Sequence, residues 1–503
     1  AHFKTASADK DAGAAFLKYK DFKPYVDYFN SMEDENIAQA VPNVRASQWM
    51  EENIPLFECS QKNFEEMYYY RWWTLRKHIK ETPVGYGMTE FLVNRSYADK
   101  YNLIACAIGH HIYESRWLRN PEYLNQIIHT WYRGNEGGPM AKMTKFSSWN
   151  ADAVLGRYMV DGNKEFLLDM VKDLEAEYAR WEKTNRLSNG LYWQGDVQDG
   201  MEESISGGRR KQYARPTINS YMYGNAKALS LIGIMTGDEG MAMKYGLKAD
   251  SIKTLVQDKL WNTDHHFFET MRGDASAEVR EAIGYIPWYF NLPDASSQYD
   301  VAWKEVMDEK GFSAPYGLTT AERRHPEFRT HGVGKCEWDG AIWPFASAQT
   351  LTAMANFMNN YPQTVLTDSV YFHQMERYVE SQHHRGRPYI GEYLDEVTGY
   401  WLKGDQERSR YYNHSTFNDL MITGLIGLRP RMDNTVEVNP LIPEGKWDYF
   451  CLDNVLYHGR NLTILWDKDG SRYQRGKGLH IYVDGKEVGH ADTLTRVLCE
   501  NVL

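Results

Sequence analysis

Carboxylic acids are concentrated in one short segment of the chain. Asp196, Asp199, Glu202 and Glu203 fall within a few residues of one another. A carboxyl group beside apolar walls loses its water, and this desolvation raises its pKa into the range where it can donate a proton near neutral pH. From composition alone, a general acid and a solvated acidic loop are equally good interpretations. The spacing of an EF-hand calcium loop is absent, and we predict no metal and no cofactor.

Aromatic residues stand beside these acids and in a second segment. Tyr192 and Trp193 precede the acidic segment, and Trp338, Asp339 and Trp343 come just before a predicted helix. Aromatic rings with a polar edge stack on the flat faces of ligands such as sugars. The pattern predicts a sugar-binding surface in which Asp339 fixes hydroxyl groups. A helix-capping loop with core aromatic residues is the alternative interpretation.

A third segment carries Glu392, Asp395 and Glu396 between two predicted helices. Hydrolysis of a glycosidic bond needs one carboxylic acid to protonate the leaving oxygen and one carboxylate to activate water on the opposite face. Glu202 and Glu392 are far apart in the sequence, so only a closed fold can bring them together. Asp199 is the second candidate for the acid, and Asp395 or Glu396 for the base. A polar turn is the alternative interpretation of this segment.

The segments that must position these residues are predicted to be helical. Apolar residues recur every three or four positions, as on one face of a helix. The predicted helices cover 60–79, 99–118, 121 onward, 150–159, 163–183, 217–235, 238–259, 297–309, 344–359, 369–382 and 414–427. No fixed-period repeat is found, which argues against an open solenoid. We therefore predict a mainly α fold, an (α/α)6 barrel whose loops form a pocket at one end.

The last part of the chain has a different period. Apolar residues alternate with polar ones at 436–438, 461–466 and 479–483, and Asp484-Gly485 predicts a hairpin turn. The chain is thus predicted to contain an N-terminal arm (1–45), a barrel (46–429) and a β-rich C-terminal domain (430–503). We expect the C-terminal domain to pack on the barrel and to carry no catalytic group.

The composition excludes several classes of partner. The chain has 503 residues, of which 42% are hydrophobic and 25% charged, as in ordinary globular proteins. A net charge of −11 argues against nucleic acid and anionic membranes as partners. The five cysteines form no CxxC pair, which excludes a zinc ribbon. Because the chain begins with Ala rather than Met, we expect a mature form that is secreted or periplasmic.

Together the three segments resemble the signatures of inverting exo-α-glycosidases. GMEES at 200–204, WDGAIWP at 338–344 and EYLDEVTG at 392–399 stand in the order of G-M-D-x-S, W-R-G-P-[IV]-W-P and E-x-Y-x-P-x-T-G. These are signatures of the trehalase-like enzymes, glycoside hydrolase family 63 and the mannosylglycerate hydrolase-like group. The resemblance covers residues 60–428. It implies an exo-acting, inverting hydrolase that cleaves a terminal, α-linked sugar from an oligosaccharide or glycoside.

The resemblance also implies residue roles. Glu202 matches the general acid and Glu392 the general base. Glu202 replaces an aspartate, which lengthens the acid by one methylene group. Asp339 replaces an arginine, so contacts with the sugar must differ, and Val397 replaces a proline.

Further residues are candidate substrate contacts. Trp149 and Asn150 open a predicted helix at the expected pocket end, and Arg215 and Asn219 enter the helix after the acidic segment. Asp199 is included in the same group. Arg215 and Asn219 would orient Glu202 or the substrate; helix capping and core packing are the alternatives.

Three other functions remain open for this sequence. A polysaccharide lyase on the same barrel would use Tyr or His bases rather than two carboxylates. A glycoside phosphorylase would keep the acid but replace water and the base with phosphate. A non-catalytic glycan-binding protein would keep the aromatic residues and tolerate the loss of both glutamates.

Overall fold

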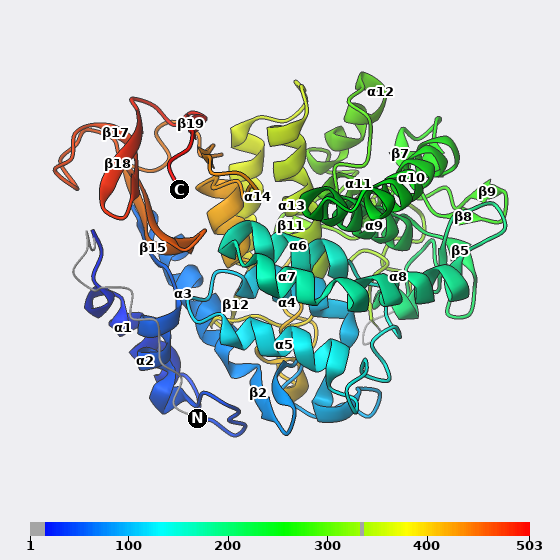
Figure 1. Ribbon diagram of the computed structural model, residues 1–503, viewed down its shortest axis with the longest axis horizontal. Coiled ribbons are helices and arrows are strands. Elements are labelled where there is room, and N and C mark those ends of the chain that lie inside the picture. Colours follow the sequence, from blue (N-terminus) through cyan, green and yellow to red (C-terminus); the bar gives the residue numbers. More distant parts are fainter. Residues whose placement is uncertain (1–15, 332–335) are drawn as a thin grey trace.

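The computed structural model describes residues 16–331 and 336–503 and consists of a helical body with a β-rich C-terminal region (Figure 1). Residues 1–15 of the predicted N-terminal arm lie outside the described residues. In Figure 1 the sheet, coloured orange to red, lies beside the blue helices of the N-terminal part. None of the described helices is both long and apolar enough to cross a membrane.

The helices and strands have the following bounds. The α-helices are α1 (Lys23–Ser31), α2 (Asn43–Asn53), α3 (Lys62–Lys77), α4 (Ile108–Ser115), α5 (Glu122–Arg133), α6 (Asn150–Asp161), α7 (Lys164–Asp169), α8 (Val171–Asn185), α9 (Pro216–Thr236), α10 (Glu239–Leu255), α11 (Ile286–Tyr289), α12 (Ser297–Asp300), α13 (Pro344–Asn360), α14 (Asp368–Ser381) and α15 (Asn418–Leu420). The longer strands are β1 (Leu56–Cys59), β2 (Ile79–Thr82), β3 (Gly85–Met88), β15 (Tyr449–Tyr457), β16 (Arg460–Asp467), β17 (Gly478–Val483) and β18 (Lys486–Ala491). The short ones are β4 (Trp193–Gln194), β5 (Tyr213–Ala214), β6 (Trp261–Asn262), β7 (Phe267–Phe268), β8 (Met271–Arg272), β9 (Ala275–Ser276), β10 (Ser313–Ala314), β11 (Gly317–Leu318), β12 (His383–His384), β13 (Arg387–Pro388), β14 (Val436–Val438) and β19 (Val497–Cys499).

Most predicted helices are present with ends shifted by a few residues, and four differ. The helix predicted over 99–118 begins only at Ile108, because Tyr101 has a left-handed backbone (φ 63°) that no α-helix accommodates. The helix predicted over 163–183 is interrupted at Met170, and that over 297–309 continues as a 3₁₀-helix. The helix predicted over 414–427 begins at Asn418 and continues as a π-helix over Met421–Leu425.

Local sequence explains where several helices begin and end. Pro216 and Pro344 stand in the first turns of α9 and α13, where a missing N–H costs nothing. Asp238 caps α10 by accepting a hydrogen bond from the Met241 N–H. Gly237 ends α9 in a left-handed conformation (φ 72°), which suits glycine best. Pro216 and Gly237 thus set the two ends of α9, the helix that follows the acidic segment.

Six helices of the body contact one another in a circuit. α4 contacts α6, α6 contacts α9, α9 contacts α11, α11 contacts α13, α13 contacts α15, and α15 contacts α4. A buried carboxylate joins the last two: Glu114 of α4 accepts hydrogen bonds from the backbone N–H groups of Phe417, Asn418 and Asp419. Each of the three motif segments leads into a helix of this circuit, α9, α13 or α15.

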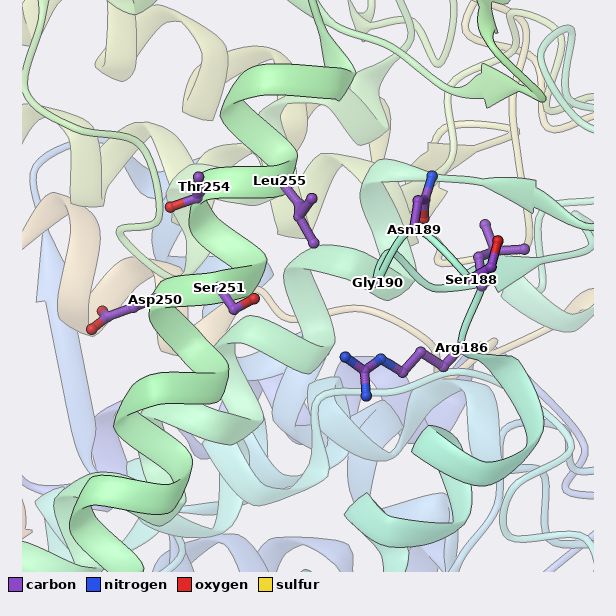
Figure 2. A pocket seen from close by; sticks show the side chains of 9 residues that line it. Arg186, Ser188, Asn189, Gly190, Asp250, Ser251, Thr254 and Leu255 are labelled. Atoms are coloured by element: carbon purple, nitrogen blue, oxygen red, sulfur yellow. The ribbon is translucent and has the colours of Figure 1, made fainter.

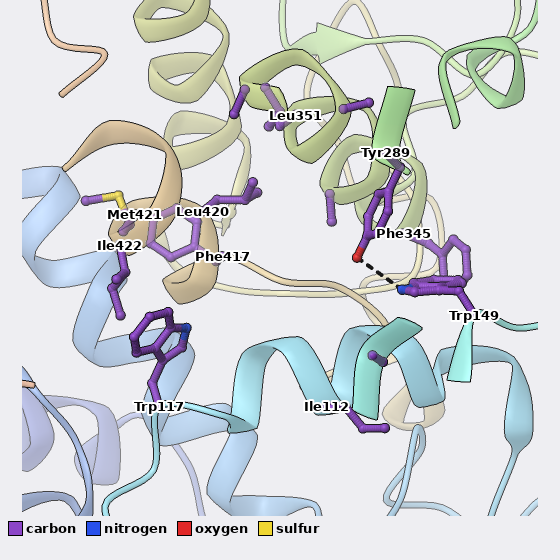
Figure 3. Packing of buried hydrophobic residues seen from close by; sticks show 14 of the residues in the cluster. Ile112, Trp117, Trp149, Tyr289, Phe345, Leu351, Phe417, Leu420, Met421 and Ile422 are labelled. Atoms are coloured by element: carbon purple, nitrogen blue, oxygen red, sulfur yellow. Dashed lines mark hydrogen bonds between the residues drawn. The ribbon is translucent and has the colours of Figure 1, made fainter. Parts of the chain in front are cut away.

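Large aromatic side chains fill the interior of the circuit (Figure 3). Trp149 is fully buried, and its Nε1 donates to the Tyr289 hydroxyl over 3.0 Å. Its ring lies edge-on to Phe345. A Cβ at Gly109 would lie 2.1 Å from the Trp149 ring, so glycine allows α4 to approach this tryptophan. The interior is therefore packed rather than open at this level.

The β-structure predicted for residues 430–503 is present. Its main sheet has the order β1-β15-β16-β17-β18, with every neighbouring pair antiparallel. Asp484 and Gly485 both have positive φ (48° and 80°) in the hairpin turn between β17 and β18. Strand β1 comes from the segment predicted for the barrel, and the Leu17 N–H donates to Asp453 of β15. The sheet is thus completed by residues from near the N-terminus.

Candidate active site

Glu202 lies in the loop between β4 and β5, just before α9. Gly200 turns this loop with φ 72°, and a Cβ there would lie 3.4 Å from the Cβ of Cys106, so the loop packs on the segment that precedes α4. The Glu202 side chain makes no hydrogen bond to another described side chain. Burial raises the pKa of Glu202 to about 7, and the charge of Glu392 adds to this effect. A large fraction of Glu202 is therefore protonated near neutral pH.

Glu392 lies in the loop that leads toward α15 and is only 5% exposed. Its buried Oε2 has no hydrogen-bond partner among the described residues, and the Lys403 Nζ lies 3.8 Å away. Burial raises the pKa of Glu392, while the charges of Lys403, Arg408 and Arg95 oppose the rise. The nearby cations favour the ionised form, which is the form that a general base requires.

Glu90 is a third buried carboxyl group in this cluster, and the sequence analysis missed it. It lies between β3 and α4, and it accepts hydrogen bonds from the Cys106 thiol (2.9 Å) and the Tyr412 hydroxyl (2.8 Å). Burial raises the pKa of Glu90 to about 7, and the charges of Glu392 and Glu202 raise it further. Because no acidic or aromatic motif surrounds Glu90 in the sequence, only the fold reveals its neighbours.

Asp199, the second candidate for the acid, is fully engaged in hydrogen bonds. Its Oδ2 accepts from the Arg215 Nε over 2.7 Å and from the Thr217 hydroxyl over 2.5 Å, and its Oδ1 accepts from the Ser147 hydroxyl. The side chains of Asp199 and Arg215 are both completely buried. Arg215 also donates to the Ser206 hydroxyl, within the loop that carries Glu202. This ion pair anchors the acidic loop to the start of α9.

The alternative bases are paired as well. The guanidinium group of Arg329 lies 2.9 Å from Asp395 and 2.6 Å from Glu396. It also lies 2.9 Å from Glu337, in the segment that contains the tryptophans. Arg329 thereby joins the second and third motif segments. Asp395 and Glu396 are both paired with it, whereas the Oε2 of Glu392 has no hydrogen-bond partner among the described residues.

The aromatic residues of the second segment form a stack. The rings of Trp338 and Trp343 lie 4.7 Å apart, and Tyr393 stacks on Trp343 at 4.5 Å. Trp338 is only 3% exposed, and its Nε1 has no partner among the described residues. Burial raises the pKa of the Cys336 thiol to about 12, and the charges of Glu202 and Glu392 contribute. This segment therefore lies beside both candidate catalytic glutamates.

Asp339 is completely buried at the same place. Its Oδ2 accepts from the backbone N–H of His331 over 2.9 Å, and its Oδ1 has no partner among the described residues. His331 also bonds to the carbonyl oxygen of Glu203, in the loop of the candidate acid. His331 thus links the first two motif segments, and the Oδ1 of Asp339 is left without a hydrogen bond from the described residues.

The remaining candidates have mainly protein partners. Asn219 bonds both the N–H and the carbonyl oxygen of Tyr192, and it thereby fixes the strand that precedes the acidic loop. Trp193 is half-buried on that strand. Asn150 accepts from Ser148 and donates to Glu177 over 3.2 Å. Trp149 is fully buried and bonded to Tyr289, as described above.

Two other features lie outside this cluster. A hollow of about 760 Å³ lies between α10 and the loop 186–190, and none of the candidate residues lines it (Figure 2). His265, Glu269 and Glu278 bring three potential metal-ligating atoms within 4.8 Å of one another. In the structure His265 hydrogen-bonds Glu269 at 2.8 Å and pairs with Glu278 at 3.1 Å. These two contacts satisfy both nitrogens of the imidazole ring.

Comparison with known proteins places this chain among glycosidases. Residues 100–415 match the mannosylglycerate hydrolase MGH1-like glycoside hydrolase domain, and residues 428–490 match the C-terminal domain of glycosyl hydrolase family 65. A solved structure named "Sialidase" is 83% identical, with a TM-score of 0.98 over 99% of this chain. The chain spans 46% of the length of that protein.

Two more distant structures share the fold. The GH63 mannosylglycerate hydrolase from Thermus thermophilus in complex with glucose is 12% identical, with a TM-score of 0.54, and the match covers 71% of this chain and 99% of that chain. The GH78 family rhamnosidase of Bacillus sp. GL1 is 11% identical, with a TM-score of 0.55, and the match covers 82% of this chain and 40% of that chain. On the strength of its domain match, the chain belongs to the mannosylglycerate hydrolase MGH1-like glycoside hydrolase family.

Proposed function

We propose that the protein is an exo-acting, inverting glycoside hydrolase in which Glu202 is the general acid and Glu392 the general base. One observation carries this proposal: Glu392 is buried, its charge raises the pKa of the partly buried Glu202, and within the described residues neither carboxyl group has the close ion pairs that engage Asp199, Asp395 and Glu396. A proton donor and a proton acceptor must both have free oxygens facing the substrate. Following the family resemblance, the substrate is a terminal, α-linked sugar.

In this mechanism Glu202 transfers its proton to the glycosidic oxygen as the bond from that oxygen to the anomeric carbon breaks. Glu392 removes a proton from a water molecule, whose oxygen forms the new bond to the anomeric carbon from the opposite face. After the reaction Glu202 is ionised and Glu392 is protonated, and exchange with solvent restores both. The configuration at the anomeric carbon is inverted.

We further propose that the six-helix circuit is the inner ring of an (α/α)6 barrel. The contact of α15 with α4 supports closure, as do the hydrogen bonds of Glu114 to the first turn of α15. A closed ring explains how residues from widely separated segments meet at one end. The aromatic interior around Trp149 would form the floor beneath the substrate.

The surrounding residues support binding and positioning. Glu90 and Asp339 are the candidates for contacts with sugar hydroxyl groups: Glu90 is buried and feels the charges of both catalytic glutamates, and the buried Oδ1 of Asp339 has no partner among the described residues. Trp338 and Trp343 supply an apolar wall. The Asp199–Arg215 pair and Asn219 hold the acidic loop in place, so their role is to position Glu202.

The first experiment is a screen of α- and β-linked oligosaccharides for released monosaccharide, followed by NMR of the earliest product. We expect an α-linked substrate to release the β-anomer first, without dependence on phosphate. Initial release of the α-anomer, or a trapped glycosyl-enzyme, would show that the mechanism is retaining and would exclude an inverting mechanism. Cleavage of β-linked substrates alone would overturn the α-linkage but leave the two carboxylate roles intact.

The name of the 83% identical relative makes sialic acid a second candidate substrate. The carboxylate of that sugar needs a cationic site. Here Glu90, Glu202 and Glu392 crowd the cluster, and the cations near Glu392 already balance that carboxylate. We therefore favour a neutral sugar. Release of sialic acid from sialyllactose that depends on Glu202 would reverse this preference.

A further inference from the structure

A second cavity lies within the helix circuit. Its volume is about 660 Å³, and its walls include residues of α4, α6, α9, α11, α13 and the segment that follows α15. Neither Glu202 nor Glu392 lines it. Volumes of roughly 300–1,000 Å³ are typical of sites for small molecules. Tyr289 lines this cavity and accepts the hydrogen bond from Trp149, so the aromatic interior adjoins it (Figure 3).

The charge of this cavity has the opposite sign to that of the protein. Its described lining carries five Lys or Arg side chains and three Asp or Glu side chains, although the chain as a whole has a net charge of −11. Burial raises the pKa of one of the three acids, Asp152, to about 7, which reduces its negative charge near neutral pH. The lining is therefore cationic and attracts anions.

Two of the cations have no carboxylate partner among the described residues. Arg116 is paired with Asp419 at 2.8 Å, and Arg431 with Glu437 at 2.8 Å. Lys227 makes no ion pair or hydrogen bond within the described part of the chain. Within the described residues, the guanidinium group of Arg429 bonds only two neutral groups.

Arg429 is the stronger of the two observations. It donates to the carbonyl oxygen of Thr423 (3.0 Å) and to the side-chain oxygen of Asn356 (2.7 Å), both of which also line the cavity. Burial lowers the pKa of Arg429 although the charges of Glu437 and Asp419 oppose the fall, so the charge of Arg429 is only partly compensated in the folded protein. A partly buried cation whose charge is incompletely compensated costs folding free energy, and a bound anion recovers part of that cost.

Neutral groups of the lining suit a hydroxylated molecule. The hydroxyl groups of Thr352 and Tyr223 line the cavity and have no hydrogen-bond partner within the described residues. The rings of Tyr289 and Phe290 supply apolar surface beside them. Aromatic rings next to free hydroxyl groups are suited to the alternating apolar and polar faces of a sugar.

We propose that this cavity is a second ligand site, which binds a small anion that carries hydroxyl groups, such as a sugar phosphate or a sugar acid, against Lys227 and Arg429. The site is separate from the proposed catalytic cluster, whose carboxyl groups would repel the same ligand. The inference does not depend on the proposed catalytic mechanism.

The test is isothermal titration calorimetry of the full chain with glucose 6-phosphate, glucuronate, inorganic phosphate and glucose. We expect at least one of the two sugar anions to bind with a stoichiometry of one, glucose not to bind at this site, and phosphate to bind more weakly than the sugar anion. A preference between glucose 6-phosphate and glucuronate identifies the anionic group. No heat from either sugar anion would overturn the proposal, and phosphate binding equally well would overturn the role of the hydroxyl groups.

Matched variants locate the binding. Lys227→Gln should weaken binding about tenfold, the loss of one charge-assisted hydrogen bond, and Arg429→Gln should weaken it at least as much. The control is Lys172→Gln, which removes one exposed lysine from α8 outside the cavity. Circular dichroism checks the folding of Arg429→Gln; Lys227 is exposed, so its variant is expected to fold. Unchanged affinity in Lys227→Gln, or an equal loss in Lys172→Gln, would exclude this cavity as the site.

Discussion

Buried charge is used in two different ways in this molecule. In the catalytic cluster, Glu392 is buried with an oxygen that has no hydrogen bond from the described residues. In the second cavity, Asp419 is bonded by Arg116 and by the Trp117 Nε1 over 2.8 Å. A buried carboxylate oxygen without a hydrogen bond costs folding free energy. Removing one member of a buried ion pair leaves the other member as an uncompensated buried charge, which destabilises the fold. The comparison therefore separates groups retained for chemistry from groups retained for structure.

The largest effect is expected for Glu392→Gln. The amide has nearly the same shape but cannot remove a proton from water, so turnover should fall by about 10²–10⁴-fold. A glycosyl fluoride should not restore it, because a better leaving group does not activate water. Thermal unfolding near pH 7 should show little loss of stability, because the Oε2 of Glu392 has no hydrogen bond to lose within the described residues and the Lys403 Nζ is 3.8 Å away. Turnover close to that of the wild type would refute Glu392 as the base.

Glu202→Gln should lose a similar factor on natural glycosides, about 10²–10⁴-fold. Here a glycosyl fluoride should restore much of the rate, because fluoride leaves with little protonation. Parallel assays of the two variants with both kinds of substrate measure the difference. If fluoride rescues Glu392→Gln and not Glu202→Gln, the two roles are reversed.

Asp419→Leu tests the buried ion pair between Asp419 and Arg116. The substitution leaves the Arg116 guanidinium buried without its carboxylate, and the free energy of unfolding should fall by about 3–5 kcal/mol. Urea denaturation followed by circular dichroism measures this loss. Below the unfolding transition, turnover should fall far less than in Glu392→Gln. An unchanged free energy of unfolding would mean that the Arg116–Asp419 ion pair does not stabilise the fold.

Asp199→Asn tests a buried ion pair inside the catalytic cluster. Asp199 lies in the same acidic loop as Glu202, but it is paired with Arg215. Removing its charge weakens the bond to Arg215, and the free energy of unfolding should fall by about 1–3 kcal/mol. Turnover should fall less than in Glu202→Gln, and fluoride should not restore it selectively. Complete loss of turnover with selective fluoride rescue would make Asp199 the acid.

The sequence predicts the positions of helices and strands better than it predicts how these elements pair and pack in the fold. Helical periodicity locates α3, α9 and α13, which are long helices. It misses the break at Met170 and the late start of α15, because these depend on tertiary contacts, such as the bonds from the first turn of α15 to Glu114. The alternation of apolar residues predicts the C-terminal strands, but the pairing of β1 with β15 joins residues too far apart for any local pattern.

The same limit applies to the candidate site. The motif segments contain Glu202 and Glu392, but they contain Asp199, Asp395 and Glu396 as well, and side-chain type does not tell free carboxylates from paired ones. The ion pairs to Arg215 and Arg329 make that distinction. Glu90 has no motif around it, and only its contacts with Cys106 and Tyr412 associate it with the cluster.

The smallest effect concerns Glu90 and the pH dependence of turnover. Because Glu202 must carry a proton and its pKa is raised to about 7, kcat/KM should fall as the pH rises through this range. The charge of Glu202 raises the pKa of Glu90, and electrostatic coupling between two sites is reciprocal, so Glu90→Gln should let Glu202 ionise at a lower pH. The alkaline limb should therefore move to lower pH by a fraction of a unit, since Glu90 is itself only partly ionised there. Glu177→Gln is the matched control: burial raises the pKa of Glu177 to about 7 as well, but its carboxylate accepts a hydrogen bond from Asn150 and none of Glu90, Glu202 and Glu392 is among the charges that shift it, so the limb should stay in place. A shift to higher pH in Glu90→Gln, or an equal shift in both variants, would exclude direct electrostatic coupling between Glu90 and the acid.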